Sequence, residues 1–167
     1  MRAIVAGLLL ALAVSGCRAR EEPAAPASSW DITAMPDPCR LLTRAEVSRV
    51  VGRDAEAGVR LASWPPLCEF VLRPDSTLLY VGDDAGATGR QEFDQMRNSG
   101  SEAEAVYGVG DEAYWLPELT SLHVMNGATH LKVVFAGPGV PAAARAREAA
   151  TALAGLAILD GPRTPIR

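Results

Sequence analysis

The chain has 167 residues, of which 49% are hydrophobic and 22% charged, and its formal net charge is −4. This length and composition predict one globular domain of ordinary size. The acidic balance argues against nucleic acid, or an anionic lipid surface, as the main partner.

Residues 1–16 are typical of an export signal, because one positive charge at Arg2 precedes an apolar run too short to span a bilayer. The run ends in Val14-Ser15-Gly16-Cys17, which resembles the lipobox of bacterial lipoproteins. The resemblance implies that Cys17 carries diacylglyceryl and palmitate-type chains. It also implies an anchor on the extracytoplasmic side of a bacterial membrane, the outer one in a cell with two membranes. The alternative is an ordinary secretory signal with a chance cysteine.

The rest of the chain divides by composition into three parts. Residues 17–36 combine the lipidated cysteine with a stretch rich in Pro, Ala, Ser and charge that lacks periodicity, which predicts a flexible tether. Residues 37–160 are expected to form a single globular domain, and residues 161–167 a C-terminal tail.

The chain has three cysteines. If Cys17 is acylated, Cys39 and Cys68 form an even set, and outside the cytoplasm two such thiols are expected to pair as a disulfide. A metal site at these cysteines has little support, since there is no CxxC pair and no histidine close in sequence.

The first predicted helix lies in DPCRLLTRAEVSRVVG. Thr43 and Glu46 have the spacing of a capping box, and Gly52 is placed to end the helix. The inner stripe would be formed by Val47, Val50 and Val51.

The next segment, LCEFVLRPDSTLLYV, alternates on both sides of Pro74-Asp75 and predicts a hairpin that buries Cys68, Phe70 and Leu72. It is followed by GDDAGATG, interpreted as a strand-to-helix loop. Asp83 and Asp84 in that loop lack the ligand spacing of a calcium site.

A second helix is expected in TGRQEFDQMRNSG. Its capping box would be Thr88 with Gln91, its inward residues Phe93 and Met96, and its end Gly100.

The segment from Tyr107 to Phe135 reads as a glycine-rich turn followed by three strands, the last two joined at Asn126-Gly127. An alanine-rich helix follows, with Pro141 near its start and Gly161-Pro162 after its end.

This pattern predicts an α+β fold of order α-β-β-α-β-β-β-α. We expect an antiparallel sheet of about five strands with helices packed on one face.

Several of these segments together resemble a family of small bacterial envelope lipoproteins whose domain has no known function. They are DPCRLLTRAEVSRVVG, LCEFVL, FDQMR, YGVGDEAYW and LHVMNGATHLKVVF, with the closing Ala/Leu helix. The resemblance implies an exported, lipid-anchored domain with a disulfide, and no particular reaction.

No motif for a hydrolase, metalloprotease or nucleotide-binding loop is present, so an enzyme is the minority interpretation and no cofactor is expected. Asp111 and Glu112 are adjacent, so in a strand they point to opposite faces and cannot act as a catalytic pair. We expect Asp111 to hydrogen-bond the Gly108–Gly110 turn instead.

The two histidines are expected to be neighbours. If Asn126-Gly127 forms a two-residue loop, His123 lies directly opposite His130, on a wet outer face with Met125 and Lys132. Two imidazoles and a thioether could hold copper or a similar metal, but a solvated pair is favoured because a metal site usually needs more ligands.

Two function hypotheses follow. The favoured one is a noncatalytic binding or structural module that binds an envelope protein or a cell-wall component. An exposed patch of Tyr107, Tyr114 and Trp115 is its candidate surface, although core packing explains these residues equally well. The alternative is a periplasmic carrier of a metal or small ligand.

Overall fold

The computed structural model describes residues 36–99 and 102–160. Residues 1–35 and 161–167 lie outside the described part, and with them the predicted export signal, Cys17, nearly all of the predicted tether and the predicted tail. Within the described ranges, no helix has both the length and the apolar character needed to span a membrane.

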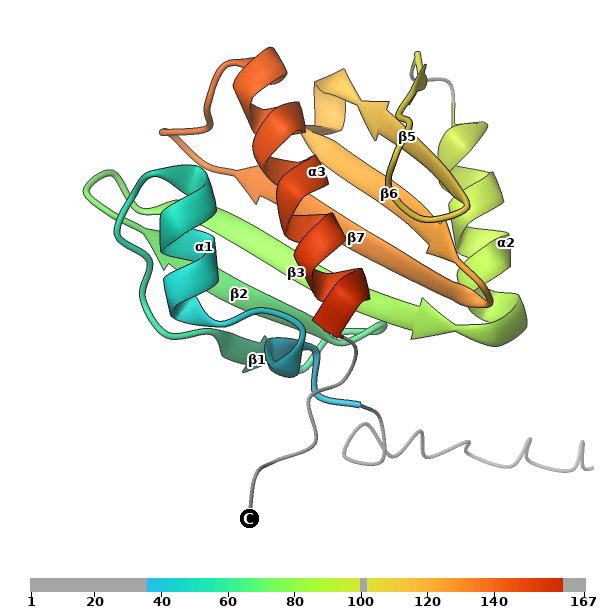
Figure 1. The fold of residues 1–167 in the computed structure, drawn as a ribbon, viewed down its shortest axis with the longest axis horizontal. Helices are drawn as coiled ribbons and strands as arrows, with labels where there is room; N and C mark the ends of the chain where they lie inside the picture. The colour runs from blue at the N-terminus through green and yellow to red at the C-terminus, as the bar shows by residue number, and fades with distance from the viewer. Residues whose placement is uncertain (1–35, 100–101, 161–167) are drawn as a thin grey trace, which may run out of the picture. The chain divides into compact units, whose positions relative to one another are not determined.

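The described residues pack around one antiparallel sheet of seven strands, in the order β1-β2-β3-β7-β6-β5-β4 (Figure 1). The strands are β1 (Val59–Leu61), β2 (Leu67–Leu72), β3 (Thr77–Ala85), β4 (Glu104–Ala105), β5 (Glu112–Leu116), β6 (Ser121–Asn126) and β7 (Thr129–Ala136). The α+β class is therefore confirmed, and the strand count of about five is wrong. The two strands that were missed, β1 and β4, are the short edge strands, which hold too few residues for an alternating pattern.

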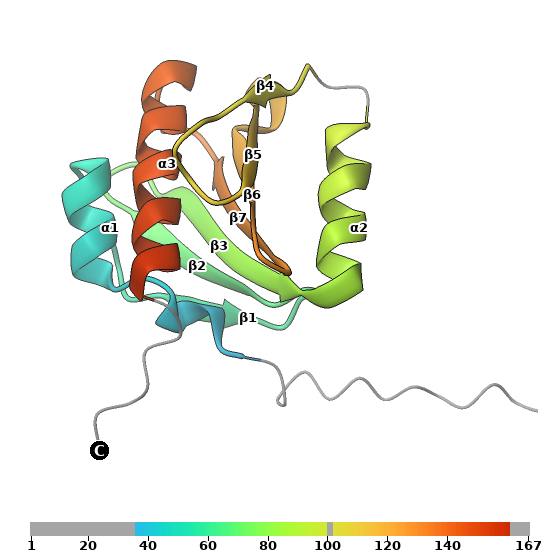
Figure 2. The same cartoon turned by 45° about the vertical axis from the view of Figure 1, so that its right-hand side comes forward.

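The helices are α1 (Arg44–Val51), α2 (Gly86–Arg97) and α3 (Ala143–Asp160), with short 3-10 turns η2 (Pro38–Arg40) and η3 (Pro117–Leu119). Figure 2 shows α1 and α3 on one face of the sheet and α2 on the other. The prediction of helices on one face is wrong. The sheet is instead the middle of three layers, and strand β6 is buried on both faces along five of its six residues.

Helix α1 follows the prediction closely. The Thr43 Oγ1 accepts from the Glu46 backbone N–H, and the Glu46 carboxylate accepts from the Thr43 N–H at 2.7 Å. Gly52 ends the helix with a φ of 71°, a left-handed conformation that favours glycine. Val47 is fully buried, whereas Val50 and Val51 are half-buried against the core.

The predicted hairpin corresponds to β2 and β3, and it buries Cys68, Phe70 and Leu72 as expected. The disulfide between Cys39 and Cys68 is present, which confirms the predicted pairing. The disulfide joins η2, which precedes α1, to strand β2. It therefore links the first described residues of the domain to the sheet.

Helix α2 begins earlier than predicted. Strand β3 continues to Ala85 and the helix starts at Gly86, so the expected loop in GDDAGATG does not exist. Gly86 has a φ of 78°, and its N–H donates to the Ala128 carbonyl in the β6–β7 turn. This tertiary contact turns the strand directly into the helix, which leaves Thr88 inside the helix. The predicted Thr88–Gln91 capping box is therefore wrong; no side-chain cap is present.

Two apolar cores result from this arrangement. The larger one lies under α1 and α3 and includes Phe70, Trp115 and Phe135. The smaller one lies under α2 and consists of Phe93, Tyr114, Leu116 and Met125, with Met96 packed against it. Phe93 is fully buried and Met96 is half-buried, so the inward face of α2 was predicted correctly. The helix ends at Arg97 with Asn98 as its C-cap, so the prediction that Gly100, which lies outside the described residues, ends it is wrong.

Candidate functional site

The main cluster of chemically active side chains lies between α2 and the sheet. His123 in β6 and His130 in β7 are side by side, with His123 Nδ1 3.0 Å from His130 Nε2 and the ring centroids 5.2 Å apart. The prediction that they share one face is confirmed. The predicted register is wrong by two residues: His123 faces Lys132 and Met125 faces His130.

The register differs because Gly127 and Ala128, not Asn126 and Gly127, form the two-residue loop. Gly127 has a φ of 58° at the first central position, where a type II′ turn requires glycine. A shift of two residues keeps every side chain on its predicted face, because side-chain direction alternates with a period of two.

The predicted wet environment is also wrong. His123 is 2% exposed and His130 is fully buried. The Tyr114 ring stacks on His123 at 5.0 Å, and the Phe93 ring meets His130 edge-on at 5.5 Å. The prediction left this face of the sheet exposed to solvent. In the structure helix α2 covers it, so the two histidines are buried.

The two histidines belong to a longer chain of polar groups, which we call the histidine network: Ser121, His123, His130, Glu92 and Lys132. The Ser121 Oγ is 3.1 Å from His123 Nε2 at one end. At the other end, His130 Nδ1 is 3.7 Å from Glu92 Oε2, and the Lys132 ammonium donates to Glu92 Oε1 at 2.7 Å.

The roles of the ring nitrogens in these contacts depend on the tautomers of the two histidines. In the contact between His123 Nδ1 and His130 Nε2, one nitrogen donates and the other accepts. When His123 Nδ1 carries the proton, His123 Nε2 can accept from the Ser121 hydroxyl, so both polar contacts of this ring are satisfied.

Burial and charge both favour the neutral imidazole. Burial lowers the pKa of His123 to about 3, and the neighbouring His130 and Lys132 act in the same direction. His130 and Lys132 in turn lower the pKa of Glu92 to about 2, against the effect of its partial burial. His123 is therefore held neutral and Glu92 ionised, with the Lys132 ammonium bound to the Glu92 carboxylate.

Asp84 extends this polar region to β3. It lies directly across from His130 in the sheet and is 6% exposed. Neither Asp84 Oδ2 nor His130 Nδ1 has a partner within hydrogen-bonding distance among the described residues. Asp83 points to the opposite face, where burial raises the pKa of its carboxyl.

The geometry of the network limits its chemistry. Ser121 has a base at hydrogen-bond distance, but its residue is only 2% exposed, so a substrate cannot reach the hydroxyl. In the described part of the chain, no three His, Cys, Asp or Glu residues are arranged to hold a metal ion. The predicted metal candidates His123, His130 and Met125 are instead packed as part of the core under α2.

The predicted aromatic surface is contradicted for two of its three residues. Tyr114 is 2% exposed and Trp115 is 1% exposed, and they belong to the cores on opposite faces of the sheet. The Tyr114 hydroxyl donates to the Phe93 carbonyl at 2.7 Å, which attaches β5 to α2. Only Tyr107 is exposed, at 88%, so these residues do not form a patch.

Asp111 and Glu112 have separate partners, in agreement with the view that they are not a catalytic pair. The Asp111 carboxylate accepts from the Gly127 N–H at 2.7 Å and so stabilises the β6–β7 turn. The predicted bond to its own turn at Gly108–Gly110 is therefore wrong. Glu112 accepts from Arg90 at 2.7 Å and thereby attaches α2 to β5.

A groove of about 700 Å³ lies between α1 and α3. Val50, Val51, Ala149 and Ala152 supply its apolar lining, and Arg53, Asp75, Arg145 and Glu148 its charges. Arg53 is fixed there by Asp75 and by the carbonyls of Arg73 and Gly139. No short stretch of the sequence predicts this groove, because its lining comes from three segments far apart in the chain.

Comparison with protein-family models, with curated proteins and with solved structures gave no match. The resemblance to small bacterial envelope lipoproteins therefore stays a prediction from the motifs.

Proposed function

We propose that the chain is a lipid-anchored bacterial envelope protein whose domain is a noncatalytic binding module. The observation that carries the first half is the disulfide between Cys39 and Cys68. Disulfides persist in oxidising compartments outside the cytoplasm, which agrees with an exported chain. The remaining cysteine, Cys17, stands in the lipobox-like sequence at the end of the leader.

The test of the anchor is the fate of Cys17. We expect the mature protein to begin at Cys17, to carry the mass of its acyl chains, and to fractionate with membranes. The Cys17→Ala variant should lose the added mass and leave the membrane fraction. Membrane association of Cys17→Ala equal to that of the wild type would contradict the proposal.

The second half rests on the groove between α1 and α3. An apolar floor surrounded by charges of both signs is the composition of a protein–protein interface, with an apolar centre and a polar rim. In the histidine network, in contrast, Ser121, His123 and His130 are buried, and only Glu92 and Lys132 reach the solvent. We therefore propose that the partner is another envelope protein and that it binds at this groove.

Photo-crosslinking in intact cells tests the groove. A photoreactive residue in place of Arg145, which is exposed at the groove, should give one discrete adduct. The matched control replaces Arg97, an exposed residue of α2 on the opposite face of the sheet, and should give none. Equal adducts at both positions, or none at either, would refute binding at the groove.

A further inference from the structure

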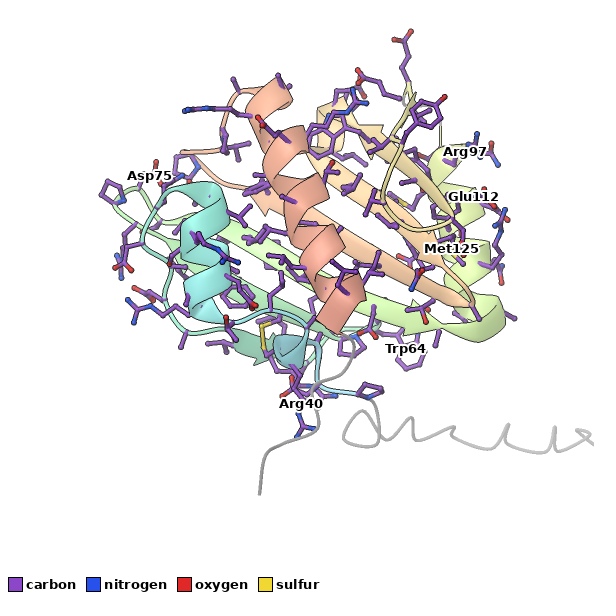
Figure 3. The ribbon with its side chains drawn as sticks, viewed as in Figure 1. Arg40, Trp64, Asp75, Arg97, Glu112 and Met125 are labelled. Carbon is purple, nitrogen blue, oxygen red and sulfur yellow. A yellow bond between two sulfur atoms is a disulfide. The ribbon has the colours of Figure 1, made fainter. Side chains whose placement is uncertain are left out.

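Three of the five large apolar side chains that are exposed in the described residues lie at one end of the domain, whereas Tyr107 and Leu119 lie beside β4 and β5. Val59 in β1 is 59% exposed, Trp64 in the β1–β2 loop is 50% exposed, and Leu159 at the end of α3 is 83% exposed. Figures 1 and 2 both place β1, η2 and the C-terminal end of α3 at this end. Figure 3 shows Trp64 and Arg40 there, and Asp75 of the groove far from them.

The chain enters the domain at the same end. The first described residue, Pro36, precedes η2 directly, and η2 packs against β1 and β2. Residues 18–35, which separate Cys17 from Pro36, number eighteen. As a flexible chain they would span roughly 25 Å. An anchor at Cys17 therefore keeps this end of the domain close to the bilayer surface.

Two arginines lie beside the apolar side chains. Arg40, at the end of η2, is exposed and has no ion-pair partner among the described residues. Arg60 is directly opposite Cys68 in the sheet, and Cys68 is bonded to Cys39, the neighbour of Arg40. Both residues therefore belong to the segments that the disulfide joins.

This combination fits the headgroup region of a phospholipid bilayer. An indole ring and aliphatic side chains insert between the headgroups, while guanidinium groups bind phosphate oxygens. We propose that Val59, Trp64 and Leu159, together with Arg40 and Arg60, form a membrane-docking patch that seats the domain on the bilayer holding the Cys17 lipid. This inference rests on the proposed lipid anchor.

The anchor and the patch act together. Tethering raises the effective concentration of the patch at the bilayer, so a few inserted side chains are enough to orient the domain. The chain as a whole is acidic, so its net charge does not by itself draw the domain to anionic headgroups, and the patch must supply the attraction. Docking through this end leaves the groove at Asp75 and Arg145 facing away from the membrane, where a partner can reach it.

Tryptophan quenching in proteoliposomes tests the patch. The lipidated protein carrying Trp30→Phe is reconstituted into vesicles of phosphatidylethanolamine and phosphatidylglycerol, with or without bromine on the acyl chains. Trp115 is 1% exposed, so quenching reports on Trp64. We expect brominated lipid to remove roughly half of the Trp64 emission, because interfacial side chains reach the acyl boundary.

The matched control moves the probe to the other edge of the sheet. Tyr107 follows β4, six strand positions away from β1, and is 88% exposed. Tyr107→Trp, combined with Trp64→Phe and Trp30→Phe, should show no quenching. A second variant, Val59→Ser with Leu159→Ser, should reduce Trp64 quenching without lowering the melting temperature, because both side chains are exposed.

The outcomes separate the two proposals. A lipidated protein in which Trp64 is not quenched, or is quenched no more than Tyr107→Trp, overturns the patch and leaves the anchor intact. The patch is also overturned, with the anchor intact, if Trp64 escapes quenching because two copies of the protein pair through their β1 edges. A mature protein whose mass lacks the acyl chains overturns the anchor and the patch with it.

Discussion

At the scale of single residues, the behaviour of the polar side chains in this domain depends mainly on whether they are buried. His123 and His130 would be exposed to water in a free hairpin, but α2 covers them and makes them core residues that contact each other. Glu92 and Lys132, whose side chains are partly exposed, supply the charges at the end of the network. Because His123 is buried and stacked on Tyr114 of the core under α2, protonation of His123 changes the stability of the α2 layer.

The pH dependence of stability tests this. The pKa of His123 is about 3 in the folded protein and near 6.5 when unfolded. Below pH 6.5 the unfolded chain therefore binds a proton at His123 that the folded chain does not. As the pH is lowered, the free energy of unfolding falls by about 1.4 kcal/mol for each pH unit. We expect this slope in urea unfolding between pH 6 and pH 5, where Glu92 stays ionised in the folded state.

The control for this prediction is His123→Gln, which removes the titrating group and keeps a polar side chain. This variant should be less stable at pH 7, because it disturbs the core, and its stability should change less between pH 6 and pH 5. An equal pH dependence in the variant and the wild type would show that His123 does not titrate as described.

At the scale of elements, α2 decides the architecture. Its first turn is fixed by the bond from Gly86 to the Ala128 carbonyl, and its exposed side is held to β5 by Arg90 and Glu112. Gly89 lies where the helix comes closest to the sheet: a Cβ there would be 2.4 Å from the Asp84 carbonyl oxygen. The close approach of α2 therefore depends on a residue without a side chain.

Two glycine-to-alanine substitutions in helices should have opposite effects. Gly89→Ala forces α2 away from β3 and should lower the free energy of unfolding by about 2 kcal/mol. Gly155→Ala in α3 meets no atom within 4 Å and should raise it by up to about 1 kcal/mol, because alanine favours the helix. Chemical denaturation measures both. A stable Gly89→Ala protein would mean that α2 is less closely packed than described.

At the scale of the whole molecule, the disulfide and the sheet divide the domain into two ends. The disulfide, β1 and the proposed membrane-docking patch lie at the end where the described chain begins, while the groove is lined by the start of α3 and the end of α1. The sheet, covered by helices on both faces, connects the two ends. This separation is what the two proposals require, because one surface would face the membrane and the other a partner.

The disulfide should contribute strongly to stability. Cys39 and Cys68 are 29 residues apart in sequence. Closing a loop of this length restricts the unfolded chain and stabilises the fold by about 3 to 4 kcal/mol in the chain-entropy model. The double variant Cys39→Ser/Cys68→Ser should unfold at correspondingly lower denaturant. Reductant should lower the stability of the wild type to the same level and leave the double variant unchanged.

The sequence by itself determined the local elements of this protein. The capping box at Thr43, the β2–β3 hairpin and the shared face of the histidines depend on residues close in the chain or on simple periodicity, and the disulfide follows from the count of cysteines. Only the tertiary structure decided that α2 covers the second face of the sheet, where it makes a dry core of Tyr114 and the histidine network. Side-chain alternation tells which residues share a face but not what lies against that face, because that depends on contacts between segments far apart in the chain.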